Sequence, residues 1–113
     1  MSKTQHPLAG RTALVTGASR GIGAAIAKRL AADGANVVAH YGSGAEETKQ
    51  LVSQIEAAGG RASAVQADLA SANGPFELME RVAQQLGGKK LDILVNNAGL
   101  APFASTADMS PAD

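Results

Sequence analysis

The sequence contains no cysteine, which excludes a disulfide framework, a thiolate metal site and a catalytic thiol. It carries no net charge at pH 7, because ten basic and ten acidic residues are interspersed along it. There is therefore no bulk electrostatic reason to expect nucleic acid or an anionic membrane as a partner. The two histidines, His6 and His40, differ in context and do not suggest a metal site.

Long apolar runs are also missing. Residues 1–10 are polar and lack the apolar stretch of a signal peptide, and no later run is long enough to span a bilayer. We therefore expect a soluble, cytoplasmic protein. With 113 residues, 45% of them hydrophobic, the chain has room for one domain with a real core, covering residues 1–113 and beginning with a flexible N-terminus at 1–9.

Apolar segments of strand type and helix type alternate along the chain. The pattern predicts strands at 12–16, 36–41, 61–67 and 91–95, with helices at 22–33, 46–58 and 75–86. Glycines 34, 59 and 87 follow the three helices as stop signals. The expected apolar stripes are Ile22, Ile26 and Leu30 in the first helix, Leu51, Val52, Ile55 and Ala58 in the second, and Phe76, Met79, Val82, Ala83 and Leu86 in the third. This order predicts parallel strands joined by helical crossovers, the start of a doubly wound α/β domain.

The connection between the first strand and the first helix is rich in glycine. It reads Thr16-Gly17-Ala18-Ser19-Arg20-Gly21-Ile22-Gly23. A pyrophosphate needs backbone N–H groups and a favourable dipole, and a helix N-terminus supplies both. Glycine is expected where a side chain would block the closest approach of the phosphate. A tight turn that binds nothing is the alternative, but the strand before and the helix after favour a dinucleotide site.

The spacing of these glycines separates classes of nucleotide-binding loop. Gly17, Gly21 and Gly23 give G-x-x-x-G-x-G, which differs from the G-x-G-x-x-G of long-chain dehydrogenases. No Lys followed by Ser or Thr is present in the loop, so it is not a nucleoside-triphosphate P-loop.

At this point the sequence resembles the short-chain dehydrogenase/reductase family. The glycine loop matches that family's cofactor motif, Asn96-Asn97-Ala98-Gly99 matches its second signature, and Asp68-Leu69 matches its adenine-contacting position. The resemblance covers the chain from about residue 10 to its end and looks closest to the 3-oxoacyl-acyl-carrier-protein reductases. It implies a Rossmann-type sheet of strand order 3-2-1-4, an NADP(H)-dependent oxidoreductase that interconverts a carbonyl and a secondary alcohol, and a homo-oligomer (dimer or tetramer).

The residues expected to bind the cofactor come from the motifs and from the end of the second strand: Gly17, Ser19, Arg20, Gly21, Ile22, Gly23, His40, Tyr41, Ser43, Asp68, Leu69, Asn97, Ala98 and Gly99. The resemblance implies that the Asp68 carboxylate accepts from the adenine amine, although Asp is also common in turns. Asn97 to Gly99 would line the ribose and nicotinamide side, and Asn96 would tie neighbouring strands together through its amide.

The end of the second strand bears on the choice of cofactor. An NAD site usually carries Asp or Glu there to bind the ribose hydroxyls, whereas this chain has His40-Tyr41-Gly42-Ser43. Without a carboxylate there is no repulsion of a 2′-phosphate, and Arg20 adds a positive charge. One charge-assisted contact is worth roughly 1.5–3 kcal/mol. We expect NADP(H) to be preferred over NAD(H), although Arg20 could instead be a solvated loop cation.

No catalytic residue is expected in this chain. The family takes its proton from a Tyr assisted by a Lys four residues later, with a Ser and an Asn, all downstream of the Asn-Asn-Ala-Gly strand. The only tyrosine is Tyr41, and the fourth residue after it is Ala45. Residues 110–113 (Ser-Pro-Ala-Asp) have the pattern of a helix start, so we expect the chain to be truncated and the catalytic residues to follow Asp113.

Two other functions remain open at this level. The chain could be a non-catalytic dinucleotide-binding module, complete as given. It could also be an S-adenosylmethionine methyltransferase, which shares a glycine-rich loop, but the missing acid after the second strand and the Asn-Asn-Ala-Gly segment oppose this. The identity of the small-molecule carbonyl or alcohol substrate is not encoded in these residues.

Overall fold

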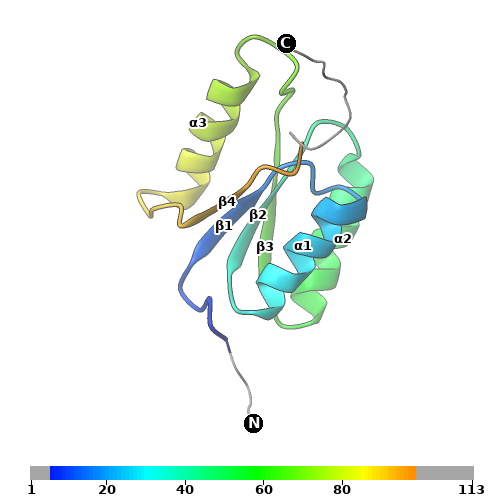
Figure 1. The fold of residues 1–113 in the computed structure, drawn as a ribbon, viewed down its shortest axis with the longest axis vertical. Coiled ribbons are helices and arrows are strands. Elements are labelled where there is room, and N and C mark those ends of the chain that lie inside the picture. Colours follow the sequence, from blue (N-terminus) through cyan, green and yellow to red (C-terminus); the bar gives the residue numbers. More distant parts are fainter. Residues whose placement is uncertain (1–5, 99–113) are drawn as a thin grey trace.

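The fold is a parallel β-sheet with helices packed on both faces (Figure 1). The computed structural model describes residues 6–98. Its elements are β1 (Thr12–Val15), α1 (Gly21–Ala32), β2 (Asn36–Tyr41), α2 (Ala45–Ala57), β3 (Arg61–Gln66), α3 (Gly74–Leu86) and β4 (Ile93–Val95). The predicted alternation of strands and helices is confirmed.

The strands lie in the order β3-β2-β1-β4 and every pair is parallel, as the family resemblance implies. Ala13 of β1 lies opposite Val37 on one side and Ile93 on the other. Because all strands run the same way, their carboxyl ends share one edge of the sheet, and the segments after β1, β2 and β4 meet there.

Helices α1 and α2 cover one face of the sheet and α3 covers the other (Figure 1). Side chains from β1 and β2 alternate between two cores, because successive residues of a strand point to opposite faces. Val15 and Val37 belong to the core beneath α1 and α2, whereas Leu14 and Val38 belong to the core beneath α3.

The predicted buried faces of α1 and α3 are only partly right. In α1 the buried residues are the small Gly23, Ala27 and Ala31, whereas Ile22 is 70% exposed and Ile26 and Leu30 flank the contact. Small residues let the helix axis approach the sheet closely, so the larger side chains sit at the margins of the contact.

In α3 two of the predicted residues, Val82 and Leu86, are buried, whereas the other three are exposed. Leu78, Val82 and Leu86 face the sheet, whereas Phe76 is 79% and Met79 46% exposed. In α2, Leu51 and Ile55 are buried as expected, Thr48 joins them, and Ala58 is exposed.

Element boundaries agree with the expectation to within two residues, and β4 shows the largest difference. The carboxylate of Asp92 accepts the Thr12 amide at 2.9 Å, and the Asp92 amide donates to the Thr12 carbonyl at 2.9 Å. The side chain of Asp92 thus takes a donor that a ladder bond would use, and the regular strand begins at Ile93.

The described residues before β1 contact the end of α1. The Leu8 amide donates to the carbonyl of Asp33, the C-cap residue of α1, at 2.8 Å, and Leu8 packs partly buried against the core beneath α1. The flexible N-terminus expected at 1–9 stays a prediction. None of the helices between residues 6 and 98 combines the length and apolar character needed to cross a membrane.

Candidate dinucleotide site

The glycine loop connects β1 to α1 at the carboxyl edge of the sheet, where a dinucleotide site is expected. Two backbone N–H groups at its start are bonded to β2. The Gly17 amide donates to Nδ1 of His40 at 3.1 Å, and the Ala18 amide donates to the His40 carbonyl at 2.8 Å. These bonds fix where the loop leaves the sheet, and the loop then turns into the helix.

The N-terminus of α1 has the features of an anion-binding site. Its N-cap residue, Arg20, makes no side-chain capping bond, and the first turn contains no acidic residue. The leading N–H groups of a helix have no partner within the helix, so their dipoles point outward at this end. A Cβ on Gly21 would meet nothing within 4 Å, which leaves open space beside these donors. A pyrophosphate fits this arrangement.

Gly23 has a packing role within the protein. A Cβ there would overlap the carbonyl oxygen of Gly17 and lie 2.6 Å from Nδ2 of Asn97. Gly23 is buried, so the absence of a side chain allows close packing between helix and loop, and its contact with the cofactor stays a prediction. Among the two glycines nearest the helix start, only Gly21 borders open space.

The segment after β4 is bonded to the loop. Nδ2 of Asn97 donates to the Gly17 carbonyl at 2.9 Å, and the Ala98 amide donates to Oγ1 of Thr16 at 3.0 Å. The Thr16 hydroxyl also lies 3.3 Å from Oδ1 of Asn96, consistent with the expected tie between strands. Asn97 and Ala98 thus reach the predicted site, while Gly99 lies outside the described residues.

Of the three residues expected to bind the cofactor at the end of β2, one is buried and two are accessible to a ligand. His40 is only 2% exposed, and its Nε2 lies 2.9 Å from the Ala67 carbonyl while Nδ1 accepts from Gly17. Both ring nitrogens are used inside the protein, so the structure gives His40 a supporting role in place of the expected cofactor contact. Tyr41 is half-buried and Ser43 is exposed, which leaves both available to a ligand.

Asp68 and Leu69 follow β3 at the same edge of the sheet. Oδ1 of Asp68 accepts the Ala70 amide at 3.0 Å, and its carbonyl accepts the Ser71 hydroxyl at 3.0 Å. Asp68 therefore serves as a turn residue, and its side chain is exposed for a further contact. Leu69 packs against the core beneath α3.

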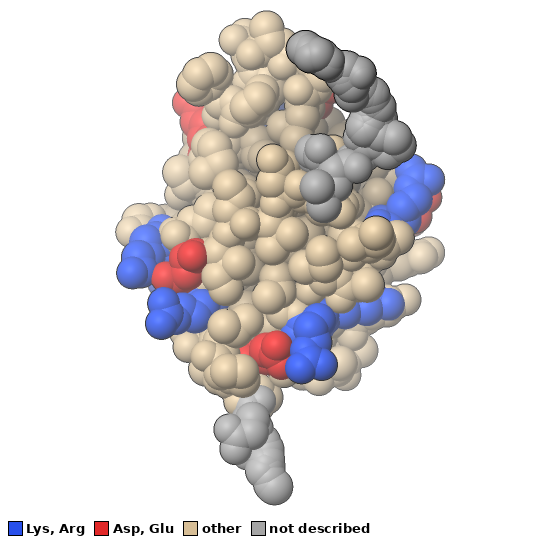
Figure 2. Space-filling view, in the orientation of Figure 1, with Lys and Arg blue, Asp and Glu red and all other residues tan. Residues whose placement is uncertain are grey.

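Charge is dispersed on the face seen in Figure 2, where basic and acidic side chains lie in small mixed groups around an uncharged centre. Arg20 belongs to none of the ion pairs among residues 6–98. In the same range no three His, Asp or Glu side chains are placed to hold a metal ion.

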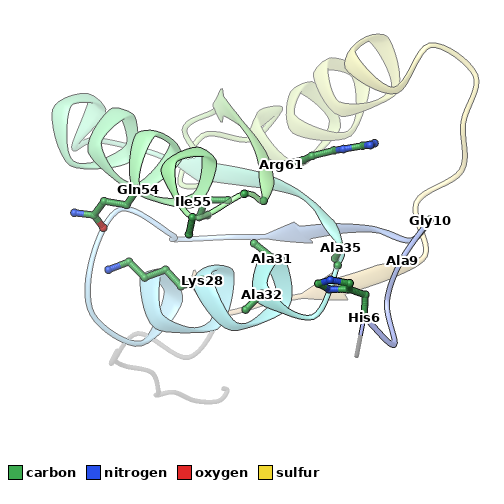
Figure 3. A pocket seen from close by; sticks show the side chains of 14 residues that line it. His6, Ala9, Gly10, Lys28, Ala31, Ala32, Ala35, Gln54, Ile55 and Arg61 are labelled. Carbon is green, nitrogen blue, oxygen red and sulfur yellow. The ribbon is translucent and has the colours of Figure 1, made fainter. Parts of the chain in front are cut away.

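A cavity of about 590 Å³ lies at the opposite edge of the sheet, between the carboxyl-terminal ends of α1 and α2 (Figure 3). Its lining is mainly small and apolar, with Ala31, Ala35 and Ile55 among the residues. Lys28 and Arg61 also line it, but they point in opposite directions in this view and do not converge on a common point. The cavity is far from the glycine loop and is not part of the candidate site.

Comparisons with known proteins agree with this geometry. Residues 11–113 match the family model described as short chain dehydrogenase. An uncharacterised oxidoreductase from Methylorubrum extorquens is 50% identical over 103 residues, which is 91% of this chain and 41% of that protein. The chain therefore spans about 40% of the length of this curated relative.

Two solved structures extend the likeness to three dimensions. A short chain dehydrogenase from Burkholderia cenocepacia in complex with NADP is 54% identical, with a TM-score of 0.74 over 94% of this chain and 42% of that one. The landomycin C-6 ketoreductase LanV, solved with NADP and rabelomycin bound, is 41% identical, with a TM-score of 0.79 over 97% and 46% of the two chains.

Proposed function

Because the chain belongs to the short-chain dehydrogenase family, we propose that it is the dinucleotide-binding part of an NADP(H)-dependent oxidoreductase that interconverts a carbonyl and a secondary alcohol. The observation that carries the proposal is the uncapped N-terminus of α1, which faces open space at Gly21. Helix dipole and free N–H groups together bind a pyrophosphate, and neither the core nor the sheet requires this end to stay open.

Different residues around this end of the helix would bind different parts of the dinucleotide. Gly21 and the following amides would hold the pyrophosphate, and Ser19 and Arg20 lie just before them in the loop. The half-buried Tyr41 and the exposed Ser43 and Asp68 lie at the ends of β2 and β3, where adenosine binds in a doubly wound sheet. Asn97 and Ala98 follow β4, on the other side of the loop, where the nicotinamide half would lie.

We propose that NADP(H) is preferred over NAD(H). Residues 40–43 bring no carboxylate to the end of β2, and the exposed Arg20 is free of ion pairs among the described residues. The bound NADP in the two solved relatives supports the proposal. Because Arg20 is exposed, its contribution is screened, and we expect a preference of about tenfold or less.

Fluorescence titration of the protein with NADPH and NADH tests this function. NADPH should bind more tightly, and Arg20→Ala should narrow the gap by weakening NADPH binding alone. Lys28→Ala removes a positive charge in the second half of α1, beside the cavity at the opposite edge of the sheet, and serves as the control, with no change expected in the ratio of the two affinities. Absence of binding by both dinucleotides would refute the site itself, and equal affinities would refute only the preference.

Catalysis by the complete protein is part of the same proposal. A reduced nicotinamide supplies a hydride to a carbonyl, and a side chain must supply the matching proton. The single tyrosine, Tyr41, is followed four positions later by Ala45, so it does not carry the family's Tyr-x-x-x-Lys pair. For this reason a non-catalytic dinucleotide-binding module is the second candidate. The mass of the natively expressed protein separates the two, because a value well above 11.3 kDa favours the enzyme.

The remaining expectations stay predictions. They are a small-molecule carbonyl or alcohol substrate, a homo-oligomer, a cytoplasmic location, and the closer likeness to 3-oxoacyl-acyl-carrier-protein reductases. None of them is needed for the binding experiment above, which depends only on residues within 6–98.

A further inference from the structure

The turn between β2 and α2 packs directly against the glycine loop. Gly44, the N-cap residue of α2, has φ +89°. A Cβ built on it would lie 3.2 Å from Oγ of Ser19 and 3.3 Å from Oε1 of Glu47. The loop hydroxyl and the helix carboxylate therefore approach the same point from two different elements. Glycine at this position keeps the space between them clear.

The two acids in the first turn of α2 differ in their surroundings. Glu46 pairs with Lys49 at 4.0 Å on the outer side of the helix, and its side chain is 80% exposed. Glu47 enters none of the ion pairs among residues 6–98, and its carboxylate lies next to Gly44 and the loop. Both residues lie in the first turn of α2, where the helix dipole attracts negative charge. Of the two, Glu47 is the one whose carboxylate lies beside the position at Gly44 that Ser19 of the loop also borders.

A carboxylate near the end of β2 is the feature that favours NAD and repels the 2′-phosphate of NADP. Residues 40–43 contain none, but the fold brings one to the same edge of the sheet from six residues beyond β2. We infer that Glu47 is a specificity-determining residue that lowers the affinity for a dinucleotide with a 2′-phosphate and thereby offsets Arg20. The inference rests on the proposed function, since it concerns the same site.

The size of the effect follows from the exposure of the charges. A carboxylate and a phosphate that are not in direct contact interact weakly in a largely aqueous setting, and salt screens them further. We expect removal of the Glu47 charge to raise the affinity for the phosphorylated ligand about two- to fivefold at low ionic strength. The ligand without the 2′-phosphate should lose affinity slightly or not change.

A matched pair of variants tests the inference. Glu47→Gln and Glu46→Gln make the same change in net charge, in the same helical turn and with the same loss of dipole compensation. The ligands are NADPH and NADH, together with adenosine 2′,5′-bisphosphate and AMP, which probe the adenosine half alone. Affinities are measured by fluorescence and calorimetry in 20 mM and 500 mM salt, and thermal melts check that both variants fold.

The expected result is that only Glu47→Gln increases the ratio of affinity for phosphorylated over unphosphorylated ligands, and that the increase shrinks in high salt. Equal ratios in Glu47→Gln and Glu46→Gln would overturn the inference while leaving the dinucleotide site intact. Failure of the unaltered protein to bind any of the four ligands would overturn the proposed function and this inference with it. If Glu47→Gln instead weakened the phosphorylated ligands, the carboxylate would be a favourable contact, and the inference would be wrong in sign.

Discussion

Nδ1 of His40 accepts a hydrogen bond from the Gly17 amide at 3.1 Å, so the end of β2 holds the first glycine of the loop. The opposite ring nitrogen lies 2.9 Å from the Ala67 carbonyl, which can only accept. The proton of the neutral imidazole therefore belongs on Nε2, and the lone pair on Nδ1 faces the loop. One buried side chain thus connects three strand ends that together form the floor of the candidate site.

His40→Ala should therefore destabilise both the fold and the loop. The change leaves the Gly17 amide and the Ala67 carbonyl without their partners and opens a cavity where a buried ring had been. We expect a loss of about 2–4 kcal/mol in the free energy of unfolding, together with weaker NADPH binding. Urea denaturation and fluorescence titration measure the two effects. The exposed His6 provides the control, because His6→Ala should change neither, and similar losses in both variants would contradict the assignment.

Gly21→Ala should separate binding from stability. Gly21 has φ +64° and Gly87 has φ +59°, and a Cβ at either position would meet nothing within 4 Å. Alanine at both positions therefore carries a similar backbone strain, about 1 kcal/mol. Only Gly21 lies at the N-terminus of α1, where the new methyl group would occupy the phosphate position. We expect similar melting temperatures for the two variants, with dinucleotide binding weakened only by Gly21→Ala. Unchanged binding in that variant would show that the phosphate lies elsewhere.

Gly23→Ala has two opposing effects on the free energy of unfolding, and the destabilising one should be larger. Alanine in a helix is favoured over glycine by about 0.5–1 kcal/mol, which alone predicts a more stable protein. The added Cβ would overlap the Gly17 carbonyl oxygen and lie 2.6 Å from Nδ2 of Asn97, and would break the 2.9 Å bond between them. Overpacking and the lost bond cost about 2–4 kcal/mol, so the variant should be less stable by urea denaturation. A rise in the denaturation midpoint would refute the packing role of Gly23.

These residues show what the sequence could and could not predict. The elements, their order and the location of the phosphate loop follow from local signals, namely apolar periodicity and the glycines after each helix. The buried face of α1 does not, because Gly23 and Ala27 are buried through close approach to the sheet and not through their hydrophobicity. The ties to the loop are also non-local. Asn97 and Gly17 lie 80 positions apart, and no pattern within either segment indicates their bond.

The proximity of Glu47 to the loop could not be predicted from the sequence either. Along the chain Glu46 and Glu47 look alike, as two acids in the first turn of a helix that complement its dipole. The direction of each side chain depends on how the turn at Gly44 places α2 against Ser19. A sequence pattern gives the helix and its charges, but the packing of two connections decides which charge faces the site.

The last prediction concerns turnover by the 113-residue chain itself. It should bind NADPH but show no steady-state oxidation of NADPH with a broad panel of ketones. Reduction of a carbonyl without a placed proton donor leaves a developing alkoxide unstabilised.

Tyr41 cannot take that role, because β1 lies between β2 and β4, and neighbouring strands are about 4.8 Å apart. The backbone of Tyr41 is thus about 10 Å across the sheet from the segment at Asn97, where the nicotinamide is expected. A chain extended to include a Ser and a Tyr-x-x-x-Lys pair should gain activity. Clear turnover by the 113 residues, abolished by Tyr41→Phe, would place the catalytic group at the end of β2 and reverse this assignment.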